Sequence, residues 1–340
     1  MKRFRCRCGQ AVFFDNALCS ACGATLGFDP GSMDMLALQL DGEQWLSEDG
    51  ASWRLCSNGR DFAVCNWLVA AAGEESRCLA CQFNRTVPNT GVADNAARWA
   101  RMEQAKKRLL FTLLELGLPL ETLAQSPQRG LAFDFVEDER SGHGFTEGLA
   151  HTGYAAGVIT INLLEADDVA REAQRQSLQE DYRTVLGHLR HESGHYFWQY
   201  LQAGGDIRGA FRELFGEESV DYAGALQAHY EQGPPPDWSS RYISAYASAH
   251  PSEDWAESWG HYLHIYDALE TAAAYDLIDQ SPAQMSMPRR IECWRELSVS
   301  LNELNRSAGL ADAYPFVLNT AVEMKLSFVD RVIALLQTPR

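Results

Sequence analysis

The 340-residue sequence predicts a mainly helical α+β protein, with a small sheet and a cysteine-rich region at its N-terminus. Eight of the nine cysteines fall in the first quarter of the chain. Beyond residue 91, apolar residues recur mostly at the spacing of amphipathic helices, whereas two short segments alternate as strands do. We therefore expect a cysteine-rich region over residues 1–90 and a mostly helical domain over residues 91–340.

The composition is that of a globular protein with an acidic surface. Hydrophobic residues make up 46% of the chain, and 29 basic against 46 acidic residues give a net charge of −17. This balance disfavours nucleic acid or an anionic membrane as partner, and we interpret four basic residues among the first seven as a solvated terminus. No apolar run is long enough to span a membrane, and Met1 is not followed by an apolar signal core, so we expect a cytoplasmic protein.

The N-terminal cysteines form two sets that are typical of structural zinc. The first set is Cys6, Cys8, Cys19 and Cys22, and the second is Cys56, Cys65, Cys78 and Cys81. In a cytosolic protein, such clustering favours metal binding over disulfides. We expect one zinc ribbon in residues 1–28 and a second zinc site in residues 43–90. Interleaved pairing, an iron–sulfur cluster, a redox C-x-x-C pair or some free buried cysteines are the alternatives.

Periodicity predicts three elements after the cysteines. A long helix should run from a cap at Asp94 to Leu116 and end at Gly117. Residues 132–136 and 157–163 read as strands. The second strand either lines a cleft and pairs with an extended substrate, or is an ordinary sheet strand. A polar segment with the composition of a helix follows at residues 164–180.

The next segment contains the H-E-x-x-H pattern His191-Glu192-x-x-His195. On a helix, the two histidines lie one turn apart on one face, so both imidazoles can bind one metal ion. Glu192 could then accept a proton from water that the metal activates. A chance match is the alternative, but apolar and aromatic residues flank the pattern at helical spacing. We expect a metal-binding helix over residues 181–201.

A third ligand must come from further along the chain, because Leu201 stands where some zinc enzymes have a third histidine. Glu253 and Glu257 are four residues apart and would share a helix face, with Ser252 as the cap. We expect Glu253 to bind the metal and Glu257 to hold a histidine through its outer N–H. The reverse assignment and a solvated acidic helix start are the alternatives.

Other polar side chains near this second helix are weaker candidates. Hydrolysis needs a donor for the oxyanion, and Tyr242, Tyr246 or His250 could supply it, although each could equally be a packed side chain. His261 and His264 are rival ligands that we interpret as structural. The C-terminal part should form helices over residues 268–277, 289–304 and 321–336.

These motifs together resemble a bacterial family of zinc-binding metallopeptidases with N-terminal zinc-ribbon cysteines. The resemblance rests on the cysteine pairs, on residues 190–195 and on residues 244–258, and it covers nearly the whole chain. It implies a zincin-like peptidase domain with one catalytic zinc ion, preceded by the two structural zinc sites. It also implies a peptide or protein as the substrate.

The resemblance also implies roles for single residues. In related zinc peptidases with a distant glutamate ligand, the first acid of E-x-x-x-E usually binds zinc, which here is Glu253, with Glu257 as its neighbour. A tyrosine seven residues earlier assists the oxyanion in one such branch, and Tyr246 stands at that distance. Our main hypothesis is a zinc-dependent peptidase with Glu192 as general base. The alternative is a zinc-ribbon adaptor whose helical domain is catalytically silent, and in either case the ribbons could recruit a protein partner.

Overall fold

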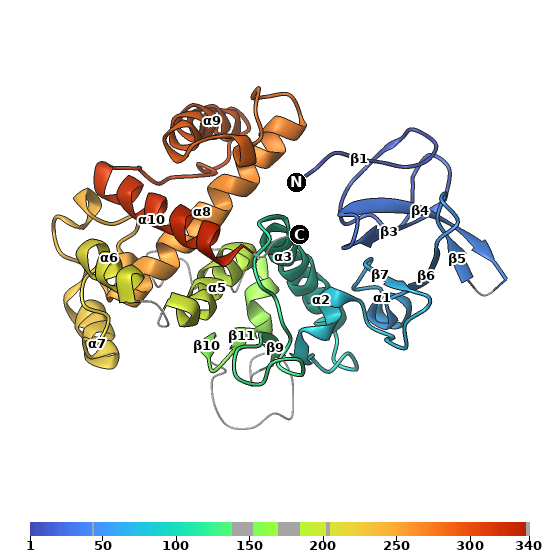
Figure 1. Ribbon diagram of the computed structural model, residues 1–340, viewed down its shortest axis with the longest axis horizontal. Coiled ribbons are helices and arrows are strands. Elements are labelled where there is room, and N and C mark those ends of the chain that lie inside the picture. The colour runs from blue at the N-terminus through green and yellow to red at the C-terminus, as the bar shows by residue number, and fades with distance from the viewer. Residues whose placement is uncertain (43, 138–151, 169–183, 202–204, 338–340) are drawn as a thin grey trace. The chain divides into compact units, whose positions relative to one another are not determined.

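The structure is a computed structural model that describes residues 1–42, 44–137, 152–168, 184–201 and 205–337. Contacts divide the chain into two compact units, Met1–Gln174 and Arg175–Pro339. The first unit carries the sheets and the second is built from helices, so the protein is of mixed α/β class (Figure 1). The boundary expected between residues 90 and 91 falls inside the first unit and stays a prediction about domains. Among the described helices, none combines the length and the apolar character needed to cross a membrane.

The N-terminal part of the first unit contains more strand than the sequence predicted. A short hairpin is followed by an antiparallel sheet with the order β3-β4-β5-β6-β7. The strands are β1 (Phe4–Arg5), β2 (Ala11–Val12), β3 (Thr25–Asp29), β4 (Asp34–Asp41), β5 (Gln44–Leu46), β6 (Ser52–Leu55) and β7 (Leu68–Ala70). Two short helices, α1 (Ser57–Phe62) and α2 (Leu79–Gln82), lie after the sheet strands β6 and β7. Most of these strands are too short to show a clear alternating pattern.

An aromatic core holds the cysteine-rich region against the long helix α3 (Asn95–Glu115). The Phe28 ring lies 4.8 Å from the Trp67 ring and 4.9 Å from the Phe14 ring, measured between centroids. Phe111 of α3 joins this cluster, 5.4 Å from Phe14. Aromatic pairs at these distances add to the free energy gained by burial. The cysteine-rich region and α3 therefore share one core.

Helix α3 confirms the predicted long helix, since Asp94 is its N-cap and Leu116 its C-cap. Gly117 follows with a φ of +66°, a conformation that glycine adopts without strain. Beside it lies a four-stranded sheet with the order β10-β11-β9-β8. Its strands are β8 (Asn84–Thr86), β9 (Ala132–Val136), β10 (Gly153–Ala155) and β11 (Val158–Asn162).

Both predicted strands exist, but β11 is not free to pair with an extended substrate. It pairs with β9 on one side and with β10 on the other, so β10 occupies the edge where an extended substrate would add. β11 is therefore an ordinary inner strand, and the substrate-pairing interpretation is wrong. A short 3₁₀ helix, η1 (Leu163–Ala166), follows it. The rest of the segment expected to be helical, from residue 169 on, lies outside the described residues.

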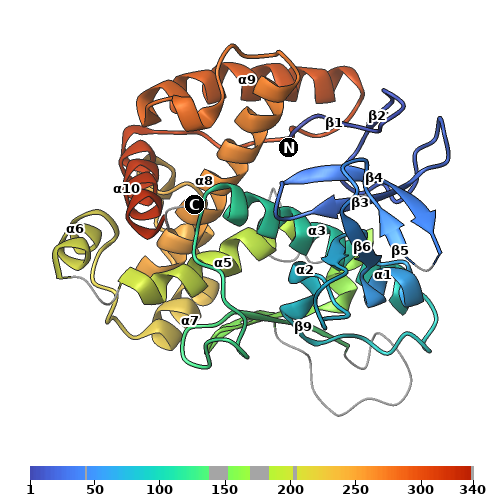
Figure 2. The same cartoon turned by 45° about the vertical axis from the view of Figure 1, so that its right-hand side comes forward.

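The second unit consists of helices connected by loops (Figure 2). They are α5 (Val185–Leu201), α6 (Gly205–Phe215), α7 (Tyr222–Gln232), α8 (Pro251–Ala274), α9 (Met287–Ser307) and α10 (Thr320–Leu336), with 3₁₀ turns η2 (Trp238–Ser240), η3 (Tyr246–Ser248) and η4 (Pro282–Gln284). A separate helix over residues 268–277 was expected, but most of that segment is the end of α8. The first residues of the expected metal-binding helix, 181–183, lie outside the described residues.

Helices α5 and α8 pack closely because glycine stands at their crossing. A Cβ atom on Gly194 would lie 2.9 Å from the Ala256 Cα, and one on Gly260 would lie 3.4 Å from the His191 backbone nitrogen. The Trp255 indole N–H donates a 2.8 Å hydrogen bond to the Gly194 carbonyl. This close crossing brings the polar face of α5 next to the N-terminal part of α8.

Candidate metal centres

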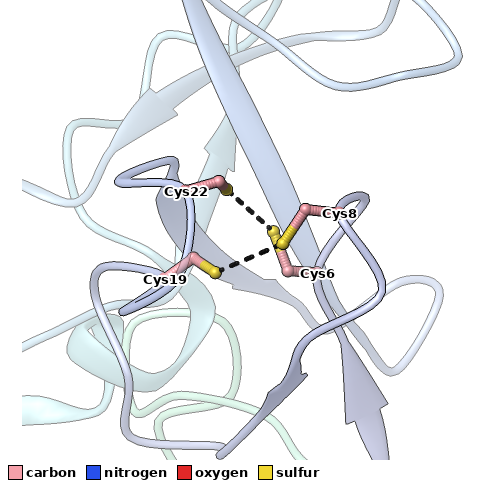
Figure 3. Close-up of side chains that lie close together, drawn as sticks. All are labelled: Cys6, Cys8, Cys19 and Cys22. Carbon is pink, nitrogen blue, oxygen red and sulfur yellow. Dashed lines mark hydrogen bonds between the residues drawn. The ribbon is translucent and has the colours of Figure 1, made fainter.

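The first four cysteines bring their sulfur atoms together (Figure 3). Cys6 Sγ lies 3.6 Å from Cys22 Sγ, and Cys8 Sγ lies 3.7 Å from Cys19 Sγ. Tetrahedral zinc with Zn–S bonds of about 2.3 Å places its sulfurs about 3.8 Å apart, so these distances fit a zinc ion. A disulfide would need about 2.05 Å, and all four residues are free cysteines.

The second set of four, Cys56, Cys65, Cys78 and Cys81, also converges on one place. Cys65 Sγ lies 3.5 Å from Cys78 Sγ. The Cys78 backbone N–H donates to Cys56 Sγ and the Trp67 backbone N–H donates to Cys65 Sγ, each at 3.4 Å. Such donors stabilise thiolates, the form that binds zinc. The two sets are those that the spacing suggested, without interleaving.

Helix α3 carries a buried cation near the second cysteine set. The Lys106 side chain is fully buried, and its Nζ lies 2.8 Å from the Glu103 carboxylate. Burial by itself lowers the pKa of Lys106, but Glu103 and the nearby Cys81 and Cys78 outweigh it and raise the pKa. The lysine therefore stays charged, and it offsets part of the negative charge that four thiolates place in this core.

The third cluster joins α5 and α8 within the second unit. His191 Nε2 lies 3.2 Å from His195 Nε2 and 3.1 Å from Glu253 Oε2, while His195 Nε2 lies 3.4 Å from Glu253 Oε1. Zinc with N and O bonds of about 2.0–2.2 Å holds tetrahedral ligand atoms about 3.4 Å apart. The three side chains therefore already stand at the spacing that one zinc ion requires. The Glu253 carboxylate is only 1% exposed.

Glu257 lies on the other side of the His191 ring. Its Oε1 lies 2.7 Å from His191 Nδ1, and its Oε2 accepts a 2.6 Å hydrogen bond from the Ser244 hydroxyl. A carboxylate on Nδ1 fixes the tautomer whose Nε2 lone pair is free to bind metal. The structure thus places Glu253 at the cluster and Glu257 behind it, the arrangement expected from the sequence.

The charges of this cluster favour a cation. Burial by itself raises the pKa of Glu253, but hydrogen bonds with His191 and His195 outweigh it and hold the pKa well below the usual range. Burial likewise lowers the pKa of His191, but Glu253 and Glu257 hold that pKa well above its ordinary value. Two carboxylates thus keep a positive charge on the imidazole. Bound zinc would replace the Nε2 proton and supply positive charge at this place.

Glu192 is buried beside the cluster and is ionised. Its Oε1 lies 3.2 Å from His188 Nε2. Burial by itself raises the pKa of Glu192, but the interaction with His188 and the nearby His191 outweigh it and lower the pKa. A carboxylate that stays deprotonated at neutral pH can accept a proton.

The three candidate oxyanion donors have different surroundings. The Tyr246 ring lies 6.0 Å from the His191 ring, next to the cluster. The Tyr242 ring instead packs on the Lys325 ammonium, 4.3 Å from the ring centre. His250 uses both ring nitrogens elsewhere, because Nδ1 accepts from the Ser252 backbone N–H and Nε2 lies 3.1 Å from the Val220 carbonyl. Of the three, Tyr246 is thus the candidate whose ring lies beside the cluster.

Helix α8 begins two residues earlier than expected, and its cap is His250 rather than Ser252. Pro251 at the first helical position favours this start, because its fixed φ suits a helix. The rival ligands His261 and His264 lie on the same helix in an aromatic cluster. His261 Nδ1 lies 2.9 Å from the Tyr314 hydroxyl, and the His264 ring packs 5.2 Å from the Tyr314 ring. Neither belongs to the three-residue cluster.

The cluster also includes a contact that the sequence analysis did not predict. The Tyr222 hydroxyl of α7 donates a 2.8 Å hydrogen bond to Glu253 Oε1. Nothing in the spacing of the chain connects Tyr222 with Glu253, which lies 31 residues later. Only the tertiary position of α7 reveals it.

Two histidines and a glutamate at zinc spacing place the chain in the class of zinc-binding proteins. The chain belongs to the family described as "Putative zinc-binding metallo-peptidase", which matches residues 95–332. A zinc-ribbon domain family matches residues 3–92. Uncharacterized proteins of Mycobacterium tuberculosis and Mycobacterium bovis are each 41% identical over 345 residues, covering 98% of this chain and 95% of theirs. No solved structure matches the chain.

Proposed function

We propose that the protein is a zinc-dependent peptidase whose centre is His191, His195 and Glu253. The observation that carries the proposal is the mutual spacing of their ligand atoms, 3.1–3.4 Å, together with the Glu257 carboxylate on His191. Zinc in such a site acidifies water and polarises a carbonyl group. The substrate is a peptide or protein, the class that membership of the family suggests.

Three residues beside the ligands would each have a separate role in hydrolysis. Glu192 is the general base, since its carboxylate is deprotonated at neutral pH and can therefore accept a proton from water. It then returns the proton to the leaving amine. Tyr246 is the donor to the oxyanion, and burial and the nearby Glu253 raise the pKa of its phenol, which keeps the proton it must donate. Glu257 holds the His191 ring in place.

Two structural zinc ions at the two cysteine sets complete the proposal, for a total of three. All nine cysteines are free, and eight of them lie in the two sets. Free cysteines at metal spacing suit a reducing compartment, so the proposal places the protein in the cytoplasm.

Glu192→Gln tests the catalytic role of this residue most directly. The variant keeps the size of the side chain but removes the basic carboxylate. Hydrolysis of a mixed peptide library, followed by mass spectrometry, should fall at least about 100-fold, because a general base contributes about that much or more. Zinc content should stay at the wild-type value.

Glu296→Gln is the matched control, because Glu296 is an exposed residue of α9. It should leave both hydrolysis and zinc content unchanged. A folded, zinc-loaded Glu192→Gln protein that hydrolyses an accepted peptide at the wild-type rate would show that the proposed mechanism is wrong.

A second function, recruitment of a protein partner by the first ribbon, is favoured by two exposed apolar side chains. Phe13 is 63% exposed and Leu18 is 62% exposed, and both flank the loop before Cys19. Exposed apolar side chains that form a contiguous patch are typical of contact surfaces, and these two lie five residues apart in the sequence. In cells, some proteins that crosslink to the wild type should no longer crosslink to a Phe13→Ser, Leu18→Ser double variant. The zinc content of the variant should be unchanged. An identical crosslinking pattern would count against a partner site here.

A further inference from the structure

Helix α7 approaches the candidate metal centre through a few polar and aromatic side chains. None of its residues is fully buried. The Tyr222 hydroxyl donates to Glu253 Oε1, and the Tyr222 ring packs edge-on against His250, 5.2 Å away. At the other end of the helix, the His229 ring lies 6.1 Å from the Tyr246 ring. A helix without a buried face depends on such contacts for its position.

The Tyr222 hydrogen bond decides how the Glu253 carboxylate is turned. Oε1 accepts the 2.8 Å bond from Tyr222, and Oε2 lies 3.1 Å from His191 Nε2. A carboxylate can bind zinc through either oxygen, and it can rotate between them if neither is held. With Oε1 held by the phenol at 3.4 Å from His195 Nε2, Oε2 is the oxygen that faces His191 Nε2.

The phenol is suited to this task because it remains a donor. A phenol titrates at about pH 10, so its hydroxyl keeps the proton at neutral pH. The adjoining chain is also fixed, since the His250 ring that Tyr222 touches caps α8 and lies 3.1 Å from the Val220 carbonyl. The start of α7 and the start of α8 are thus joined twice, next to the ligand.

We propose that Tyr222 is a positioning residue of the metal centre, which orients Glu253 for zinc binding and thereby ties helix α7 to the loaded site. This proposal rests on the proposed zinc site at His191, His195 and Glu253. It adds a residue of a different helix to that site. The expected consequence is a coupling between zinc binding and the order of α7.

Tyr222→Phe tests the proposal by removing one hydroxyl. Tyr230→Phe, on the same exposed helix, removes the same group outside the contact with Glu253. Zinc affinity is measured by competition with a chromophoric chelator, and the same titration of His195→Ala is subtracted to isolate the helix site. Tyr222→Phe should lower the zinc affinity of that site at least about tenfold, the usual cost of losing a partner of a metal ligand. Tyr230→Phe should stay within about twofold of wild type.

Hydrogen exchange gives the second measurement. Adding zinc to the wild-type protein should slow exchange of the α7 amides, and Tyr222→Phe should lose most of that protection while α5 keeps it. Wild-type zinc affinity in Tyr222→Phe, or an equal loss in Tyr230→Phe, would overturn the proposal. Because neither measurement uses a substrate, failure here is separate from failure of the peptidase assay with Glu192→Gln.

Discussion

Glu253 and Glu257 carry the same chemical group one turn apart, yet the two carboxylates have different surroundings. Glu253 is 1% exposed and lies within 3.4 Å of both histidine Nε2 atoms. Glu257 contacts only the Nδ1 side of His191 and is held by Ser244. The sequence left the order of the two open, because residues four apart on a helix share a face. Only the placement of α5 against α8 separates them.

Removing each carboxylate in turn should lower the zinc affinity by unequal amounts. Glu257→Gln should weaken zinc binding about 10–100-fold, since the His191 ring loses its anionic partner. Glu253→Gln removes a ligand and should cost more. Both affinities can be measured by chelator competition on proteins whose cysteine sites are filled. A larger loss for Glu257→Gln than for Glu253→Gln would reverse the two assignments.

The burial of His261 should make the free energy of unfolding depend on pH. Burial, together with Arg190 and His191, lowers the pKa of His261 to about 4 against the opposing effect of Glu257. The unfolded side chain titrates near 6.5, so between pH 6.5 and 4 the unfolded state binds a proton that the folded state does not. This histidine therefore costs stability as the pH falls through that window.

His261→Asn should remove that part of the acid sensitivity. Between pH 7 and pH 5, the wild type should lose about 2 kcal/mol more of its unfolding free energy than the variant. Urea unfolding at the two pH values measures both losses. Equal losses would mean that the imidazole is protonated as easily in the folded protein as in the unfolded chain.

Single residues differ in how far the sequence could place them. His191, Glu192 and His195 lie on one helical turn, so their relation follows from local geometry alone. Tyr222 could not be predicted, because its contact with Glu253 depends on how two helices pack. Ser252 was expected to cap α8, but the preceding His250 and Pro251 start the helix earlier.

At the scale of elements, the crossing of α5 and α8 decides whether the centre forms. Gly194 faces Ala256 so closely that an added Cβ would lie 2.9 Å from the Ala256 Cα. This backbone cannot move without moving His191 and His195, which belong to the same helix. The requirement for glycine here comes from packing, because glycine within a helix is otherwise unfavourable.

Gly194→Ala should therefore destabilise the protein by about 1–3 kcal/mol, the usual cost of overpacking. Gly209→Ala is the matched control, because a Cβ there would meet nothing within 4 Å on helix α6. The control should instead stabilise by up to about 1 kcal/mol through helix propensity. Thermal unfolding of the two variants compares them directly. A stabilised Gly194→Ala protein would show that the helices are not closely packed at this point.

The long elements were predictable and the short ones were not. Helix α3 and the strands β9 and β11 have enough residues for their periodicity to show. Most strands of the N-terminal sheet are only three to five residues long, and the cysteines among them obscured any alternation. The partner of β11 was also missed, since β10 has only three residues and pairing with it depends on the turn between them.

At the scale of the whole molecule, metal is the feature that the two units have in common. The first unit holds two sets of four cysteines, and the second holds two histidines and a glutamate. Four cysteines without an open position suit structural zinc, whereas three protein ligands leave a fourth position for chemistry. Membership of the family agrees with zinc at both kinds of site, and the number of ions is the part that is proposed.

Zinc per chain, measured by atomic emission on untagged wild-type protein and on His195→Ala, shows whether His191, His195 and Glu253 hold a metal ion. We predict about three zinc ions in the wild type and about two in the variant, because only the helix site loses a ligand. Both proteins should keep the same far-ultraviolet circular dichroism. An equal zinc content in the two folded proteins would contradict the account, because all bound metal would then belong to the cysteines.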